Sequence, residues 1–144
     1  MQRTWIKDTV SKVGEEVLLQ GWIHHRRNMG KMVFIDLRDA TGLCQVVFLP
    51  NHAEALTVAT ELGHEDVVSI KGKVNARPPK QVKADQVCGS IEIEALELTI
   101  LNKAAVTPFE VNKDTKEISE ELRLKYRYLD LRTDRMQRNL RYRD

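Results

Sequence analysis

Apolar and polar residues alternate through most of the first two thirds of the chain, a pattern typical of strands with one buried face. The alternation predicts five strands, over residues 17–27, 32–38, 43–49, 65–78 and 89–101. Gly21 lies inside the first strand, where a glycine indicates a bulge or a tight bend of a barrel. The chain is therefore expected to be mainly β.

The second strand separates its two faces clearly, because Phe34 falls on the same side as charged residues. The other side carries the aliphatic residues Val33, Ile35 and Leu37. In the fifth strand, Glu92 opposes isoleucine residues in the same way. An aromatic ring and a carboxylate are thus predicted on the polar face of the sheet.

Glycines and polar residues mark the connections between the strands. Residues 28–30 are predicted to form a compact turn, and residues 39–42 a hairpin with a bulge. Asn51 can cap a short helix that ends at Gly63. The apolar stripe of this helix consists of Ala55, Leu56, Ala59 and Leu62. A further helical turn is predicted over residues 9–13.

Three strands, a short helix and two more strands form the element order of an OB-fold, a five-stranded Greek-key barrel that binds oligonucleotides or oligosaccharides on an exposed face. Residues 1–101 are predicted to form this barrel, and residues 102–118, which lack a sustained period, a linker. Residues 119–144 are predicted to form a helical tail capped by Ser119. Its second helix begins near Thr133 and still continues at the last residue, so the chain is interpreted as part of a longer one.

Composition and charge restrict the class of protein. The chain is 42% hydrophobic and 31% charged, which is ordinary for a soluble globular domain. The net charge of +2 is unevenly distributed, because residues 122–144 are strongly basic and the first 121 residues are slightly acidic. Nucleic-acid binding must therefore depend on local clusters of charge. The sequence contains neither a membrane-spanning apolar run nor a signal-peptide pattern, which predicts a cytoplasmic protein with no membrane partner.

The cysteines and histidines point to no catalytic or metal site. Cys44 and Cys88 each fall in a strand-like apolar run, which favours two reduced core thiols over a disulfide. Neither they nor the four histidines have the spacing of metal ligands.

The candidate chemistry lies on the polar face and at the turn beside it. A basic cluster over residues 24–27, with Lys31 across the turn, could follow a phosphate backbone. Phe34 offers a ring for a single-stranded base, an interaction worth about 1–3 kcal/mol per base. The alternative is that a helix or loop covers this ring. Basic residues of the fourth strand and of the loop after it could extend the positive rim, namely Lys71, Lys73, Arg77, Lys80 and Lys83.

Two further polar side chains suit the edges of unpaired bases. The amide of Gln45 can donate and accept together, which matches the Watson–Crick edge of uracil, although a turned amide matches cytosine. The carboxylate of Glu92 complements the N1–H and N2–H₂ donors of guanine. For each of these residues the alternative is a solvated position on a strand.

The segments that carry a family resemblance are GWIHHRRNMGKMVFIDLRDATGLCQVVF, GSIEIEALELTILNKAAVTPFEV, LRLKYRYLDLR and RMQRNLRYR. Together they closely resemble the N-terminal anticodon-binding domain of aspartyl-tRNA synthetases of the bacterial type. Lysyl- and asparaginyl-tRNA synthetases share the fold and the Phe and Gln positions, but they fit less well at the fifth strand and at LDLR. A free-standing OB-fold protein that coats single-stranded nucleic acid, and an adaptor that binds a partner through its tail, are the alternatives from other classes.

The resemblance implies a role for each candidate residue. Phe34 would stack on the central anticodon uracil, and Gln45 would bond its edge. Glu92 would face the first base, guanine, and Arg27 would contact the third base or its phosphate. The residues implied near the RNA backbone or in the neighbouring turn and loop are His25, Arg26, Met29, Lys31, Arg77 and Gln81.

The resemblance also implies where the chemistry of the parent enzyme takes place. That family joins aspartate to ATP and then to tRNA, using motifs of a domain C-terminal to this one. Those motifs are missing from the sequence. The chain is therefore expected to bind the anticodon stem-loop of tRNA(Asp) as a monomer without charging it and without a cofactor. ATP and Mg²⁺ would belong to the catalytic domain of a homodimeric parent.

Overall fold

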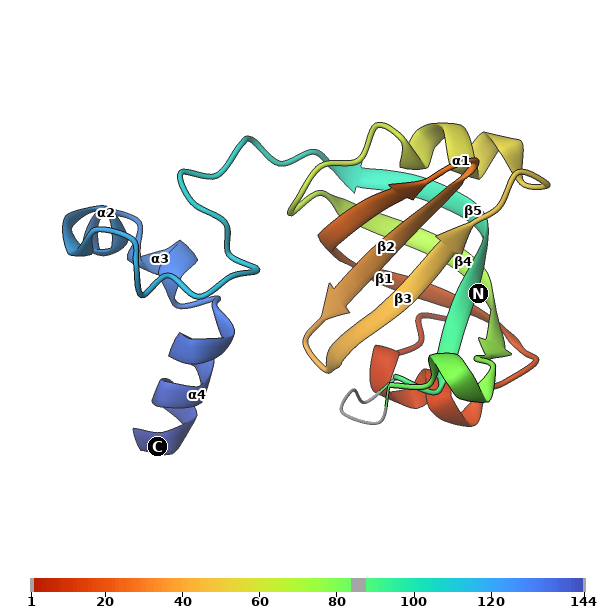
Figure 1. The fold of residues 1–144 in the computed structure, drawn as a ribbon, viewed down its shortest axis with the longest axis horizontal. Coiled ribbons are helices and arrows are strands. Elements are labelled where there is room, and N and C mark those ends of the chain that lie inside the picture. The colour runs from red at the N-terminus through yellow and green to blue at the C-terminus, as the bar shows by residue number, and fades with distance from the viewer. Residues whose placement is uncertain (1, 84–87, 144) are drawn as a thin grey trace. The chain divides into compact units, whose positions relative to one another are not determined.

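The chain forms two compact units, Met1–Ala104 and Ala105–Asp144, in a computed structural model that describes residues 2–83 and 88–143 (Figure 1). The first unit is a closed barrel of five strands. These are β1 (Glu16–Met29), β2 (Met32–Asp39), β3 (Gly42–Phe48), β4 (Val67–Ala76) and β5 (Ile91–Asn102). Helix α1 (Ala53–Ala59) connects β3 to β4, and two short 3₁₀ helices are η1 (Ile6–Ser11) and η2 (Pro79–Gln81).

The strands are neighbours in the order β1-β2-β3-β5-β4, and pairing of β1 with β4 closes the barrel. β3 and β5 run parallel, and the other neighbouring pairs are antiparallel. This element order and the mainly β content confirm the predicted OB-fold barrel. In Figure 1, α1 lies at one end of the barrel, beside β5.

The core of the barrel follows the predicted alternation. On β2, Ile35 and Leu37 are fully buried, whereas Phe34 and Asp36, which alternate with them, are partly exposed. On β5, isoleucines alternate with Glu92 in the same manner. The largest fully buried side chains are Phe48, Ile6, Leu19, Ile23, Ile35, Leu37, Ile70, Ile91 and Ile93. A period of two therefore identified the buried face of these strands correctly.

The hairpin between β1 and β2 is tighter than predicted. Pairing continues to Met29 and Met32, so the turn consists of Gly30 and Lys31 rather than residues 28–30. Gly30 has φ +62°, which suits the first central position of a type II′ turn. The predicted boundaries were wrong because cross-strand pairing extends the strand through Asn28, a residue common in turns, and Met29.

The bulge of β1 lies at His24, because the register with β2 shifts between Ile23 and His25. Gly21 is therefore not the bulge, which was one of the two roles predicted for it. A Cβ atom at Gly21 would lie 2.2 Å from the backbone oxygen of Arg38 on β2. Glycine therefore permits a close approach of two backbones in the region where β1 pairs with both β2 and β4.

The hairpin between β2 and β3 depends on the buried carboxylate of Asp39. Its Oδ1 accepts from the backbone N–H groups of Thr41 at 2.7 Å and Gly42 at 3.2 Å. Its Oδ2 accepts from the N–H of Ile6 at 2.9 Å, which ties η1 to the barrel. The predicted turn over 39–42 is present, but Asp39 pairs directly with Gly42 and the predicted bulge is absent from it.

The boundaries of the first helical turn and of α1 differ from the predictions. Residue His52, not Asn51, occupies the N-cap position of α1, and no side chain caps the helix there. The first helical turn spans Ile6–Ser11 rather than residues 9–13. α1 ends at Ala59 rather than near Gly63, so Leu62 of the predicted stripe follows the helix. Ala55, Ala59 and Leu62 are nevertheless buried in the core, and Leu56 is partly buried against it.

Both cysteines are free and buried in the first unit, as predicted. Burial raises the pKa of the Cys44 thiol and of the Cys88 thiol above their ordinary value. Cys88 lies in the turn before β5, and its Sγ donates to the backbone oxygen of Ile6 at 3.1 Å. The two thiols therefore belong to the barrel core.

The second unit contains α2 (Glu120–Lys125), α3 (Arg127–Asp130) and α4 (Asp134–Arg143). The hydroxyl oxygen of Ser119 accepts from the N–H of Leu122 at 3.3 Å, which confirms the predicted cap. Phe109 and Val111 of this unit are buried, although they fall in the range predicted as a linker. In the described part of the chain, no helix is long and apolar enough to cross a membrane.

Candidate nucleic-acid interface

The outer face of the barrel brings four of the predicted residues together. Arg27 of β1 lies opposite Phe34 of β2, and Asp36 of β2 lies opposite Gln45 of β3. Residues directly opposite each other in antiparallel strands share a face. Glu92 of β5 joins this face beside Gln45, because β3 and β5 are neighbours.

Three of these side chains form a hydrogen-bonded row across β1, β3 and β5. Nη2 of Arg27 donates to Oε1 of Gln45 at 3.3 Å. Nε2 of Gln45 donates to Oε2 of Glu92 at 3.4 Å. The row, Arg27–Gln45–Glu92, therefore places a cation, an amide and an anion side by side on one surface.

Phe34 lies next to the cationic end of this row. The guanidinium carbon of Arg27 is 6.0 Å from the centre of the Phe34 ring, which is within the range of a cation–π contact. Arg27 is also 3.9 Å from the carboxylate of Asp36. Phe34 itself is partly exposed. An aromatic ring flanked by polar groups is the arrangement that stacks and bonds single-stranded bases.

The basic cluster of β1 divides between the two sides of the sheet. The bulge at His24 adds one residue, so the alternation of β1 changes side after Ile23. As a result His25 and Arg27 lie opposite outward residues of β2, whereas Arg26 lies opposite the buried Ile35. Nη1 of Arg26 donates to the backbone oxygen of Thr60, at 2.5 Å. Arg26 is thus not brought to the outer face.

The turn residues and His25 lie at the edge of this face. His25 is exposed, and its ring centre is 5.7 Å from that of His64. Met29 and Lys31 are exposed at the hairpin between β1 and β2. These positions are open to a ligand that extends beyond Phe34.

The loop between β4 and β5 contributes less exposed charge than predicted. Arg77 is only 7% exposed, and its Nη1 donates to the backbone oxygen of Gln81 at 3.4 Å. The side chains of Lys80, Gln81 and Lys83 are exposed. Residues 84–87 of the predicted loop lie outside the described residues.

Sequence reasoning missed one polar residue of this region, Asn75 of β4. Asn75 lies opposite Glu92, and its Nδ2 donates to Oε2 of Glu94 at 3.3 Å. His52 approaches the other oxygen of Glu94 at 3.4 Å. The available signal was the alternation of β4, which gives Asn75 the same parity as Lys71 and Lys73.

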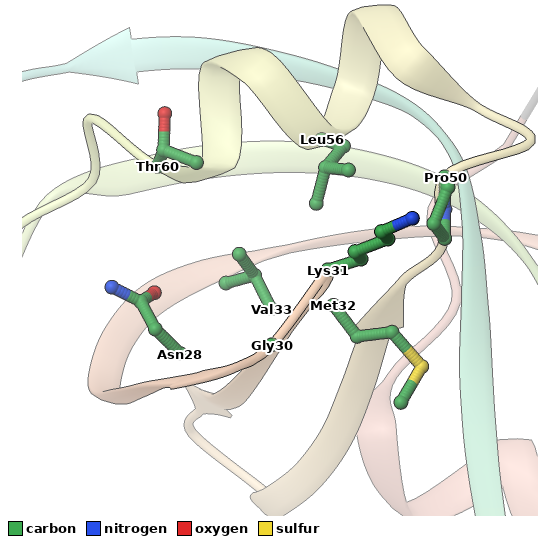
Figure 2. Close-up of a pocket in the computed structure, with 8 residues that line it drawn as sticks. All are labelled: Asn28, Gly30, Lys31, Met32, Val33, Pro50, Leu56 and Thr60. Carbon is green, nitrogen blue, oxygen red and sulfur yellow. The ribbon is translucent and has the colours of Figure 1, made fainter.

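A pocket of about 460 Å³ lies between the β1–β2 hairpin and α1, with Leu56 facing Val33 across it (Figure 2). Its other lining residues are Asn28, Gly30, Lys31, Met32, Pro50 and Thr60. Phe34, Gln45 and Glu92 are not among them. This pocket is therefore separate from the face that carries Phe34 and the hydrogen-bonded row.

The closed five-stranded barrel with a polar, aromatic outer face defines the class of protein. Residues 17–101 match the family described as the OB-fold nucleic acid binding domain, in its tRNA anticodon form, and the chain belongs to this family.

The chain is also similar to individual curated proteins. It is 49% identical over 119 residues to the aspartate–tRNA ligase of Lysinibacillus sphaericus. It is 44% identical over 138 residues to the aspartate–tRNA(Asp/Asn) ligase of Halothermothrix orenii. These matches cover 83% and 95% of this chain but 20% and 23% of the relatives. The chain thus spans about a fifth of the length of these curated relatives.

A solved structure shows the same architecture. The asparaginyl-tRNA synthetase of Pyrococcus horikoshii, complexed with asparaginyl-adenylate, superposes with a TM-score of 0.74 and 29% identity. The match covers 92% of this chain and 29% of that chain.

Proposed function

We propose that this chain is the anticodon-binding domain of an aspartate–tRNA ligase and that it recognises the anticodon of tRNA(Asp). The observation that carries the proposal is the row Arg27–Gln45–Glu92 beside Phe34 on the outer face of an OB-fold barrel. The similarity to aspartate–tRNA ligases over 83–95% of the chain favours this parent over a lysyl- or asparaginyl-tRNA synthetase.

Each group of the outer face has a distinct role in the proposal. Phe34 stacks on the central uracil, and the amide of Gln45 bonds its Watson–Crick edge. Glu92 accepts from the N1–H and N2–H₂ groups of the first base, guanine. Arg27 contacts the third base or its phosphate. Lys31, at the exposed hairpin, follows the RNA backbone.

The remaining predicted residues have weaker structural support for direct contact. His25 and Met29 are exposed near the face and can meet the flanking backbone, and Gln81 is exposed in the next loop. Arg26 and Arg77 bond backbone oxygens of the barrel unit. We therefore assign these two arginines a role in supporting the surrounding loops rather than in contacting RNA.

The aminoacylation reaction is assigned to the remainder of a longer parent enzyme. The curated relatives are about five times the length of the matched segment, and ATP and Mg²⁺ would act in their catalytic part. This chain by itself is expected to bind tRNA as a monomer without charging it. The parent would be a cytoplasmic homodimer.

Binding of tRNA transcripts tests the proposal directly. A filter-binding or fluorescence titration compares a tRNA(Asp) transcript with variants that carry another base at the central anticodon position. The expected loss is about 1–3 kcal/mol, since one stacked and hydrogen-bonded base is altered. Equal affinity for all transcripts would contradict anticodon recognition. Equal affinity combined with tight binding of short polypyrimidines would favour a sequence-tolerant single-strand-binding protein instead.

A further inference from the structure

The amide of Gln45 lies between two groups of opposite hydrogen-bonding character. Its Oε1 accepts from Nη2 of Arg27 at 3.3 Å, and its Nε2 donates to Oε2 of Glu92 at 3.4 Å. A guanidinium can only donate, and an ionised carboxylate can only accept. If the amide turned over, donor would face donor at one end and acceptor would face acceptor at the other. Only one orientation of the amide therefore satisfies both neighbours.

This orientation depends on strands that are distant in sequence. Arg27 comes from β1, Gln45 from β3 and Glu92 from β5. Arg27 is further positioned by Asp36, at 3.9 Å, and by the ring of Phe34. The amide is thus oriented by the folded barrel itself, before any base arrives.

A fixed amide distinguishes the two pyrimidines. Uracil presents the O4 acceptor next to the N3–H donor, whereas cytosine presents the N4–H₂ donor next to the N3 acceptor. For a base held in one pose by stacking on Phe34, an amide that can turn over would pair with either base. An amide that cannot turn over pairs with one of them.

We propose that Arg27 and Glu92 act as positioning residues, which hold the Gln45 amide in the orientation that selects uracil over cytosine at the central anticodon position. This inference rests on the proposed function, because that function supplies the base on Phe34 and its identity. It adds a second role to two residues whose proposed contacts are with the third and first bases.

The test uses two anticodon stem-loops that differ only by uracil or cytosine at the central position. The measured quantity is the ratio of their affinities for each protein variant. A lost contact of Arg27 or Glu92 with its own base weakens both stem-loops equally and cancels in this ratio. The wild-type chain should prefer the uracil stem-loop by roughly tenfold, since two hydrogen bonds of ordinary strength depend on the amide orientation.

Two double variants change the neighbours of Gln45 in different ways. In Arg27→Gln/Glu92→Gln both neighbours can donate or accept, so the ratio should fall to about one. In Arg27→Glu/Glu92→Arg the polarity of the row is exchanged, so the preference should invert toward cytosine. Lys31→Gln is the matched control, because it removes a charge from the nearby hairpin and should lower both affinities without changing the ratio.

The side-chain amide signal of Gln45 in ¹⁵N-edited NMR spectra gives an independent readout without RNA. Its two amide protons should exchange with solvent more slowly in the wild type than in Arg27→Gln/Glu92→Gln. Thermal unfolding identifies any variant that fails to fold. If the variant with exchanged charges does not fold, Arg27→Gln/Glu92→Gln alone tests the positioning role, because both substituted positions are partly exposed.

The possible results separate the inference from the function on which it rests. If the wild type binds both stem-loops equally, uracil recognition fails and the inference fails with it. A wild-type preference that persists unchanged in both double variants would overturn the positioning role alone and leave anticodon recognition intact.

Discussion

On strand β2, Ile35 and Leu37 are fully buried in the barrel, whereas Phe34 and Asp36, which alternate with them, lie partly exposed on the outer face. The inner residues belong to the apolar core of the barrel. The outer residues belong to a polar surface that involves β1, β3 and β5. One strand thus contributes to stability on one side and, in the proposed function, to recognition on the other, so substitutions on its two faces should have separable effects.

The largest expected effect comes from the inner face. Leu37→Ala removes a fully buried side chain from the core and should lower the free energy of unfolding by about 2–5 kcal/mol. Denaturant unfolding measures this loss. At low temperature the folded fraction should retain its RNA affinity. A loss below about 1 kcal/mol would contradict the assignment of Leu37 to a tightly packed core.

The outer face should show the opposite behaviour. Phe34→Ala should weaken binding of the tRNA(Asp) anticodon stem-loop by about 1–3 kcal/mol, because a stacking surface is lost. Its effect on unfolding should be smaller than that of Leu37→Ala, because Phe34 is partly exposed. Phe34→Tyr retains the ring and serves as the control for affinity. Unchanged binding of Phe34→Ala would remove the ring from the proposed interface.

The buried carboxylate of Asp66, which lies away from the outer face, should make the free energy of unfolding depend on pH. Burial alone would raise the pKa of Asp66. Hydrogen bonds from the backbone of Gly63 and Ala104, together with the ammonium of Lys103, outweigh burial and lower the pKa below its ordinary value of 3.8. Asp66 accepts from these groups at 2.9, 2.8 and 3.0 Å.

Because the pKa is lowered in the folded state, the stabilisation by Asp66 is present above pH 3.8 and is lost as the pH falls through the lowered value. Asp66→Asn should lower the free energy of unfolding at neutral pH by about 1 kcal/mol and reduce the acid sensitivity. Unfolding curves between neutral pH and pH 2 measure both effects. If the variant loses stability at low pH as strongly as the wild type, groups other than Asp66 cause the acid sensitivity. RNA affinity at neutral pH should remain that of the wild type.

The smallest effect is expected at the exposed hairpin. Lys31→Ala should change the free energy of unfolding by less than about 0.5 kcal/mol. If Lys31 contacts one phosphate, the slope of log affinity against log salt should decrease by about 0.7. The loss of affinity should be the same for stem-loops with uracil and with cytosine. A base-dependent loss would indicate contact with a base instead of the backbone.

The sequence predicted the barrel well where local alternation was sufficient. The two faces of β2 follow from a period of two, and so does the position of Glu92 on β5. Burial of Cys44 and the cap at Ser119 were also predicted correctly. These features depend on neighbours that are close in the chain, so a short window of sequence contains the necessary information.

The basic cluster of β1 shows where local alternation fails. Continued from Ile23, the alternation would turn Arg26 outward and Arg27 inward. The bulge at His24 reverses this, so that Arg27 reaches Phe34 while Arg26 bonds the backbone of Thr60. The position of the bulge depends on how β1 pairs with β2, and the sequence of β1 does not reveal it.

The polar face therefore has two origins. The residue types that suit unpaired bases, an aromatic ring, an amide, a carboxylate and a guanidinium, are visible in the amino-acid sequence together with the strands that carry them. The row Arg27–Gln45–Glu92 arises only when the barrel closes, because its members lie 18 and 47 positions apart along the chain. Backbone pairing of β1 with β2, of β2 with β3 and of β3 with β5 brings them within hydrogen-bonding distance and orients the amide between its two charged neighbours.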